Sequence, residues 1–500
     1  MDEDRTISEI PFRIALLGDW SGRANRGSFE IGADWSERGP VSVTRDNLDD
    51  VMAALDVKVH LNVDNDPDAP LEISFKELDD FHPDSIFNRL LLFEELKDLR
   101  SQLVDSEKFA AAADRVRALT KYPERDSPTS FESEKPADGN QGLLDQILSR
   151  AADSETPSER QPPYTSPEIR DLVKDAMKPY MIPASQLQSD ELVAALDTYT
   201  GHKMNTILHH PDFQSLEGAW RGLHLLVSRL DLGTELQLYL LDVSKAELGA
   251  DLKAASDPHS SQLYKAVVED DASGRGDAPW ALISTNYTFE AVAEDAELLE
   301  RLSLLAMSAS APVVSAASPH FIGCESFGQA RDPDDWKLAI DPNFEAKFEA
   351  LKDLESASYL GLALPRFLLR LPYGKDTNPT EEFQFEEMPT GVTPPHESYL
   401  WANPSFAVTC LVGEAFNRNG WKFVPRDLLE LDGLPLHVHR QDGEAQIKPC
   451  AEILMTVRGA EKIIDQGLIP LISLKHKDSI RLGSFQSLAK KSLAEHWRSS

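Results

Sequence analysis

Cysteine is scarce in this sequence, since only Cys324, Cys410 and Cys450 occur among 500 residues. No two of them have the Cys-x-x-Cys spacing, which argues against a structural zinc site, and their wide separation argues against a disulfide framework. We therefore expect a protein of a reducing compartment, the cytoplasm, in which each cysteine is a small buried apolar side chain.

Positive charge and long apolar runs are also in short supply. Lysine and arginine number 50 against 84 aspartates and glutamates, a formal net charge of −34. Nucleic-acid phosphates and anionic lipid surfaces would repel such a chain, so we expect no nucleic-acid partner. The N-terminus carries acids where a secretory signal carries bases, and no apolar run is long enough to cross a membrane. We expect no membrane insertion.

Catalytic motifs are missing as well. The sequence has no Gly-x-Ser-x-Gly turn and no GxxxxGK[ST] phosphate loop. Two weaker candidates are Cys324 near His320, for a thiol site, and the pair His437 and His439 on one strand face, for a metal. A cysteine among apolar neighbours is usually packed inside, and the histidine pair lacks a third ligand at a telling distance. We expect no catalytic residue, no cofactor and no metal site.

The stretch from Leu196 to Leu230 is the most distinctive part of the chain. Its aromatic and aliphatic residues recur at three- and four-residue spacing, which predicts two amphipathic helices separated near Pro211. Glu217 and Arg221 are four residues apart, so we expect them to pair along the edge of a core helix.

Apolar runs alternate with helical patterns through much of the sequence. Runs such as 12–18 and 235–243 predict buried strands. The alternation favours a multi-domain α/β (mixed α+β) protein, with mixed, partly parallel sheets flanked by helices. The other expected strands cover 41–44, 57–63, 71–75, 280–284 and 312–316, and the expected helices cover 47–55, 86–103, 166–180, 190–210, 244–255, 289–307 and 343–351.

Residues 123–164 have the composition of a flexible, disordered acidic linker, being rich in Pro, Ser, Glu and Asp. Within the linker, 142–152 predicts a short amphipathic helix that docks either on a partner or on its own chain, because so short a helix is marginal alone. Its apolar stripe consists of Leu143, Leu144, Ile147 and Leu148. The predicted regions are 1–122, the linker 123–164, 165–488 and a C-terminal tail 489–500.

The run ILHHPDFQSLEGAWRGLHLLV resembles the signature of the large subunit of the contractile sheath of bacterial type VI secretion systems. The later segments LPRFLLRLPYG, FQFEE and LDGLPLHVHRQDGEAQIKPCAEILMT resemble the same subunit. The signature residues are His209, Pro211, Phe213, Leu216, Trp220 and Arg221.

The first region resembles the small subunit of the same sheath, through IPFRIALLGDWSGR, RDNL and FKELDDFHPDSI in that order. The two resemblances imply a natural fusion of both subunits, a non-enzymatic structural protein that self-assembles as a helical or ring-shaped homo-oligomer. They also imply an inner-tube protein and a baseplate as partners. The helix 142–152 resembles the handle that a ring-shaped AAA+ unfoldase grasps in many such systems.

Arg366 and Arg370 lie four residues apart, shortly before an acidic run. These charges predict either ion pairs within the fold or contacts between subunits, and the sequence does not separate the two. The acidic candidates are Glu381, Glu382, Glu386 and Glu387.

The sequence departs from its relatives after Leu488, where the resemblance ends. The usual large subunit continues into a C-terminal domain that helps to hold the inner tube and exchanges strands with neighbours. Without that domain we expect that the standard mesh does not form unaided. One alternative follows from this gap, a truncated sheath homologue that acts as an accessory factor and caps or regulates assembly by binding sheath or baseplate. A separate, less favoured alternative is an enzyme using Cys324 or the His437/His439 strand.

Overall fold

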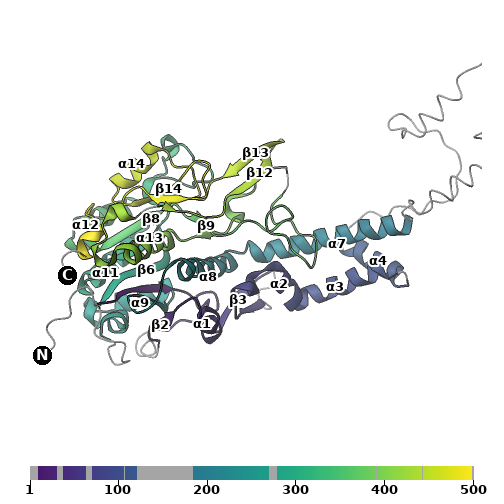
Figure 1. Ribbon diagram of the computed structural model, residues 1–500, viewed down its shortest axis with the longest axis horizontal. Helices are drawn as coiled ribbons and strands as arrows, with labels where there is room; N and C mark the ends of the chain where they lie inside the picture. Colours follow the sequence, from purple (N-terminus) through teal and green to yellow (C-terminus); the bar gives the residue numbers. More distant parts are fainter. Residues whose placement is uncertain are drawn as a thin grey trace, which may run out of the picture. The chain divides into compact units, whose positions relative to one another are not determined.

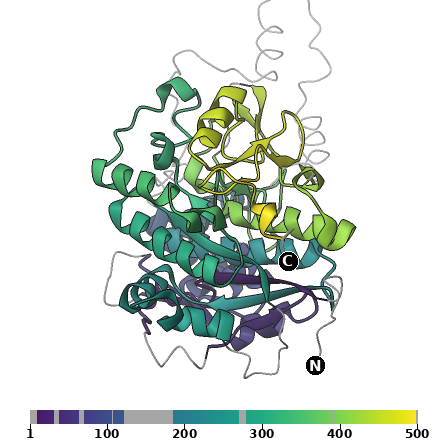
Figure 2. The same cartoon turned by 90° about the vertical axis from the view of Figure 1, so that its left-hand side faces the viewer.

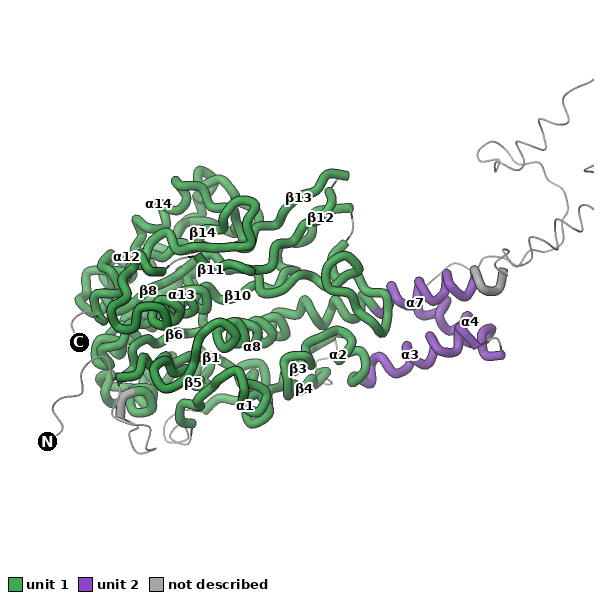
Figure 3. The backbone as a smooth tube through the Cα atoms, in the orientation of Figure 1, with its two compact units in different colours: residues 1–90, 201–500 green, residues 91–200 purple. Residues whose placement is uncertain are grey.

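The computed structural model describes residues 10–30, 38–63, 70–105, 107–120, 184–269, 279–389, 391–428, 430–441 and 443–497. The chain divides into two compact units, residues 1–90 with 201–500 and residues 91–200 (Figure 3). The predicted linker 123–164 and the predicted helices 142–152 and 166–180 lie outside the described residues. The region boundaries near them stay predictions.

A nine-stranded mixed sheet organises the first unit, and helices lie on both of its sides (Figures 1 and 2). Its six inner strands, from β14 to β5, run parallel, whereas β2, β15 and β11 are antiparallel to their neighbours. This architecture confirms the predicted mixed α/β class. In spatial order the strands are β11 (Glu430–Leu431), β15 (Ile480–Leu482), β14 (Ile469–Ser473), β8 (Leu360–Leu364), β7 (Val313–Ala317), β6 (Trp280–Phe289), β1 (Phe12–Gly18), β5 (Leu236–Asp242) and β2 (Val41–Val43).

Strand β1 lies between β5 and β6, so an early segment of the chain fills the middle of the sheet. All seven of its residues are buried. A parallel strand that is covered on both faces typically has a nearly continuous apolar sequence, which is the pattern of this segment. Leu16, for example, is opposite Leu240 on one side and Ser284 on the other. The predicted regions 1–122 and 165–488 therefore contribute to one sheet.

The helices of the first unit form two layers. On one face α9 (Lys245–Ala254), α11 (Ala293–Ser308), α12 (Pro342–Lys352) and α14 (Val457–Asp465) share a core with sheet residues that include Leu17 and Ile283. On the other face lie α8 (Pro211–Arg229) and α13 (Pro404–Asn419). Thr409 of α13 donates a 2.8 Å hydrogen bond from Oγ1 to Oγ of Ser284 on β6. The sheet is thus covered on both faces.

The predicted break near Pro211 is confirmed. Helix α7 (Ala184–Leu208) ends just before it, and Pro211 begins α8. Proline suits a first helical position because an N–H there has no partner within the helix. His210 caps α8 by accepting a hydrogen bond at Nδ1 from the Asp212 amide, 3.3 Å away.

The predicted helix 86–103 is wrong as one element, because Leu90 separates α2 (Pro83–Arg89) from α3 (Leu91–Val104). Leu90 has an extended backbone, with ψ of 131°. The predicted helix start at 289 is also wrong, since β6 continues to Phe289 and α11 begins at Ala293. In both cases the helical spacing of apolar residues in the sequence continues across a point where the backbone is not helical.

The remaining elements of the first unit are small. Helix α1 (Leu48–Ala54) precedes β3 (Val57–Leu61), which pairs antiparallel with β4 (Leu71–Phe75). Two further antiparallel pairs are β9 (Phe367–Leu368) with β10 (Trp401–Ala402) and β12 (His437–Gln441) with β13 (Glu444–Lys448).

Residues 489–497, predicted as part of a tail, pack into the first unit. Leu493 is fully buried, and Trp497 Nε1 donates a 2.7 Å hydrogen bond to the Ala281 carbonyl oxygen on β6. Apolar burial of Leu493 and Trp497 is what holds the segment in place.

The second unit is built from α3, α4 (Phe109–Thr120) and the first part of α7. Phe93 and Leu99 of α3 are fully buried, as is Val116 of α4. Arg100 Nε donates to Asp197 Oδ1 at 3.0 Å. Within the described residues of both units, no helix is long and apolar enough to cross a membrane.

Candidate functional site: two ion-pair networks

A buried ion-pair network joins the signature helix α8 to the segment that follows β9. The guanidinium of Arg370 lies between two carboxylates, with Nε 2.9 Å from Glu217 Oε1 and Nη1 2.7 Å from Glu387 Oε2. Arg221 Nε reaches the same Glu217 oxygen at 2.7 Å, and its Nη2 lies 3.2 Å from the hydroxyl of Tyr373. Two carboxylates and two guanidiniums thus balance each other's charge where unpaired charge would be costly.

Burial and pairing act in opposite directions on the pKa values of this network. Burial raises the pKa of Glu387, but Arg370, together with nearby His209 and a hydrogen bond from the Tyr373 amide, outweighs it and lowers the pKa to about 2. Burial lowers the pKa of Arg370, yet Glu217 and Glu387 raise it well above its ordinary value. Glu387 and Arg370 are therefore held in their ionised forms at neutral pH.

The predicted pair of Glu217 and Arg221 is formed, but not along an edge. The side chain of Glu217 is fully buried, whereas that of Arg221 is 20% exposed. The four-residue spacing of Glu217 and Arg221 thus predicts their contact correctly. The third partner, Arg370, lies 153 residues after Glu217 in the chain. Helical spacing alone does not reveal such a partner.

The other signature residues are core side chains around α8. Trp220 Nε1 donates a 2.8 Å hydrogen bond to the carbonyl oxygen of Trp20, two residues after the end of β1. Phe213 packs edge-on against Phe75 and Phe81, and Leu216 is buried. His209 Nε2 lies 3.4 Å from Glu387 Oε1. The signature therefore joins α8 to β1, to β4 and to the ion-pair network.

A second ion-pair network surrounds Arg366. Its Nη2 lies 2.7 Å from Glu452 Oε1 and 3.0 Å from Glu397 Oε2, and His396 Nε2 lies 3.0 Å from the same Glu452 oxygen. Burial raises the pKa of Glu452, but Arg366 and His396 together lower it to about 2. No local sequence pattern singles out Glu452 or His396, because their burial and partners depend on chain segments far apart.

Ligand atoms of His396, Glu397 and Glu452 lie within 4.8 Å of one another, and this is the one such group of three among the described residues. Arg366 already neutralises both carboxylates, so a cation there would have to displace a guanidinium. These residues fit an ion-pair network better than a metal site.

The acidic candidates divide by burial. Glu387 is buried within the network, whereas Glu381, Glu382 and Glu386 are exposed. The amides of Glu381 and Glu382 donate to the carboxylate of Asp84, which fixes the backbone and leaves the Glu381 carboxylate exposed. Arg370 and Glu387 have contacts within the fold. The exposed carboxylates of Glu382 and Glu386 also accept hydrogen bonds within the fold, from Asn88 Nδ2 and from the Lys375 amide, each at 3.0 Å. The alternative of contacts between subunits stays a prediction.

The weaker chemical candidates are not members of either network. Cys324 is buried, and burial raises the pKa of its thiol to about 11, which disfavours the thiolate needed for attack. The rings of His437 and His439 lie 5.6 Å apart, and His437 Nδ1 is hydrogen-bonded to the Tyr399 hydroxyl at 2.8 Å.

Comparison with known families accounts for most of the chain. Residues 190–489 match the family VipB, described as EvpB/VC_A0108, tail sheath N-terminal domain. Residues 1–121 match the family described as Type VI secretion system, VipA, VC_A0107 or Hcp2. The chain belongs to the tail sheath family of type VI secretion systems. Both resemblances found in the sequence, to the large and the small sheath subunit, are confirmed.

A curated relative agrees with this assignment. The type VI secretion system sheath protein TssC1 of Pseudomonas aeruginosa is 34% identical to this sheath-family chain over 308 residues. The matched part is 60% of this chain and 61% of the relative, so the chain spans about three fifths of that protein's length.

Proposed function

We propose that this chain is a structural component of a type VI contractile sheath, in which fused small and large subunits assemble around an inner tube and contract to drive effector delivery. The two family matches on consecutive parts of one chain support this role. They favour it over an accessory factor that caps or regulates assembly.

The observation that carries the proposal is the place of β1. This strand belongs to the part that matches the small subunit, yet it lies between β5 and β6 of the part that matches the large subunit. Removing it would leave two open strand edges in the centre of the sheet. The two parts thus share one sheet, and their one-to-one stoichiometry is fixed by the covalent chain.

The partners of this role are other copies of the chain in a helical or ring-shaped homo-oligomer, the inner-tube protein and the baseplate. The exposed Glu381, Glu382 and Glu386 supply contacts between subunits, as does the outer side of Arg366. Rigid-body repacking of subunits would release free energy on contraction.

The helix 142–152 would be the handle for a AAA+ unfoldase that recycles contracted sheaths. The apolar stripe Leu143, Leu144, Ile147 and Leu148 supports this assignment, because four adjacent apolar side chains on a short helix favour docking on a partner. Assembly of this kind takes place in the cytoplasm.

The role requires no catalysis. The raised thiol pKa of Cys324 supports this, as does the hydrogen bond that occupies His437. Replacing Cys324 with Ala should leave every assembly phenotype unchanged.

Negative-stain electron microscopy of the purified chain, alone and mixed with the inner-tube protein, tests the proposal. Tubes or rings are expected. Discrete small particles under both conditions would overturn the sheath role and favour the accessory one.

Charge reversal tests the subunit contacts separately. The double variant Glu381→Lys/Glu382→Lys should lose assembly while keeping its thermal unfolding midpoint. The matched control Glu345→Lys/Glu349→Lys changes two exposed acids on α12 and should still assemble. Equal assembly by both variants would remove the 381–382 segment from the interface.

A further inference from the structure

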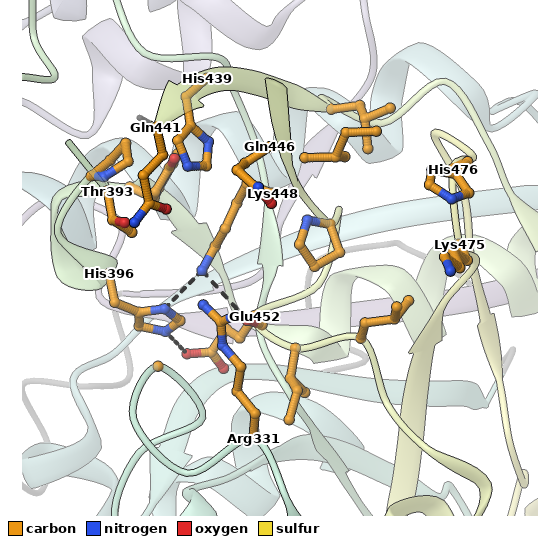
Figure 4. Close-up of a pocket in the computed structure, with 18 of the residues that line it drawn as sticks. Arg331, Thr393, His396, His439, Gln441, Gln446, Lys448, Glu452, Lys475 and His476 are labelled. Carbon is orange, nitrogen blue, oxygen red and sulfur yellow. Dashed lines mark hydrogen bonds and ion pairs between the residues drawn. The ribbon is translucent and has the colours of Figure 1, made fainter. Parts of the chain in front are cut away.

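A cavity of about 690 Å³ lies beside the β12–β13 pair (Figure 4). Its walls come from β12, β13 and the segments 393–399, 449–454 and 474–476, together with Arg331. A volume of this size suits a small organic ligand.

The charge of the cavity is opposite to that of the chain. Arg331, Lys448 and Lys475 line it with a single carboxylate, Glu452, although acids outnumber bases 84 to 50 in the whole sequence. Arg366 and His396 already engage that carboxylate. A positive concavity on an acidic protein concentrates the field that attracts an anion.

A chain of hydrogen bonds holds Lys448 in place. Its ammonium donates to His396 Nδ1 at 2.9 Å, and His396 Nε2 in turn lies 3.0 Å from Glu452 Oε1. Because an ammonium only donates, Nδ1 is the acceptor and Nε2 carries the proton given to Glu452. The rings of Trp401 and Tyr399 lie 5.1 and 5.3 Å from the ammonium. Among the described residues, no carboxylate forms an ion pair with it.

The cavity also brings like charges together and leaves a polar atom unsatisfied. Figure 4 shows the side chains of Arg331 and Lys448 pointing toward the same end of the cavity, beside His396. Burial, with a contribution from Arg331, lowers the pKa of Lys448 to about 8. His439 Nδ1 is buried and has no hydrogen-bond partner among the described residues. A bound oxyanion would offset the repulsion between Arg331 and Lys448 and would give His439 Nδ1 a hydrogen-bond partner.

Arg331 and Lys475 lack a carboxylate partner within the part of the chain that the structure describes. Lys475 and His476 lie on the wall across from His396 (Figure 4). An anion with charge at both ends could contact both walls.

We propose that this cavity binds a small polyanion of phosphate or carboxylate chemistry, with Lys448, Arg331 and His439 around one anionic group and Lys475 near another. The inference is independent of the proposed sheath function, because binding is measured on the dispersed chain.

Titration calorimetry of the full chain with pyrophosphate and with citrate, at constant ionic strength set by chloride, tests the proposal. Saturable binding of pyrophosphate, citrate or both is expected. Tighter binding of pyrophosphate assigns phosphate chemistry, and tighter binding of citrate assigns carboxylate chemistry. Absence of saturable binding of either probe would overturn the proposal.

Paired variants distinguish the cavity from general charge effects. Lys448→Met should weaken binding about tenfold or more, since a charge-assisted hydrogen bond is lost. Lys337→Met removes an exposed lysine that does not line the cavity and should bind as the unaltered chain does. Equal weakening in both would mean non-specific attraction and would contradict the proposal.

A second pair covers the case in which Lys448→Met fails to fold. Arg331 is exposed, so Arg331→Gln should fold normally and still weaken binding of the probe. The control Arg440→Gln, on the outer side of β12, should fold normally and leave binding unchanged. If neither probe binds but Arg331→Gln blocks assembly, the cavity receives an acidic segment of another copy and the small-ligand proposal is wrong.

Discussion

Arg370 Nε lies 2.9 Å from Oε1 of Glu217, although the two residues are 153 positions apart in the chain. Both side chains are buried, at 8% and 0% exposure. This contact joins the segment after β9 to the signature helix α8 and is the centre of a balanced network of charges. Removing one partner leaves a buried charge without compensation, so the network makes the fold sensitive to single substitutions.

Arg370→Met should lower the free energy of unfolding by about 3 to 5 kcal/mol, because Glu217 and Glu387 lose their buried counter-ion. Urea unfolding at neutral pH measures the change. The matched control is Arg458→Met, whose partner Asp334 is exposed, and it should cost less than about 1 kcal/mol. Equal costs would mean that burial does not set the strength of these pairs.

Glu387 should make the protein sensitive to acid. Its pKa is lowered from 4.5 to about 2 in the fold, so its stabilising contribution is present above pH 4.5 and is lost as the pH falls toward 2. Glu387→Gln should therefore be less stable at neutral pH and should lose less stability over that acidic window. Urea unfolding across the window measures both effects. Glu349→Gln, an exposed control, should retain the full acid dependence of the unaltered chain.

His437 should contribute a separate dependence at higher pH. Burial, with His439 nearby, lowers its pKa from 6.5 to about 4, so the unfolded chain takes up the proton first as the pH falls between those values. The expected loss is about 3 kcal/mol at about 1.4 kcal/mol per pKa unit. His437→Gln, which can still bond to Tyr399, should abolish this loss, and His476→Gln, on an exposed site, should not. A pH profile unchanged by His437→Gln would contradict the assignment.

Gly222 should not tolerate a side chain, because α8 and α13 approach closely there. A Cβ at this position would lie 2.5 Å from the Phe406 ring, whereas one at Gly249 of α9 would lie 3.6 Å from its nearest neighbour, on Leu298. Gly222→Ala should destabilise by about 1 to 3 kcal/mol through overpacking. Gly249→Ala should stabilise by up to about 1 kcal/mol through helix propensity. Thermal unfolding of both variants provides the check, and a stabilised Gly222→Ala would disprove the close approach.

The sequence by itself determined the local elements and the family. The spacing of apolar residues predicted the helices on either side of Pro211, and the apolar run at 12–18 predicted a buried strand. The sequence motif around Trp220 identified the sheath family. These signals could be found in the sequence because they come from residues near one another in the chain.

Only the tertiary structure decided which distant segments meet. That β1 lies between β5 and β6, that Glu217 is buried rather than at an edge, and that Lys448 is bonded to His396 all depend on pairings far apart in sequence. Local periodicity carries no information on such pairings. They are set by how the apolar faces of helices and sheet cover one another and by which buried charges then find a partner.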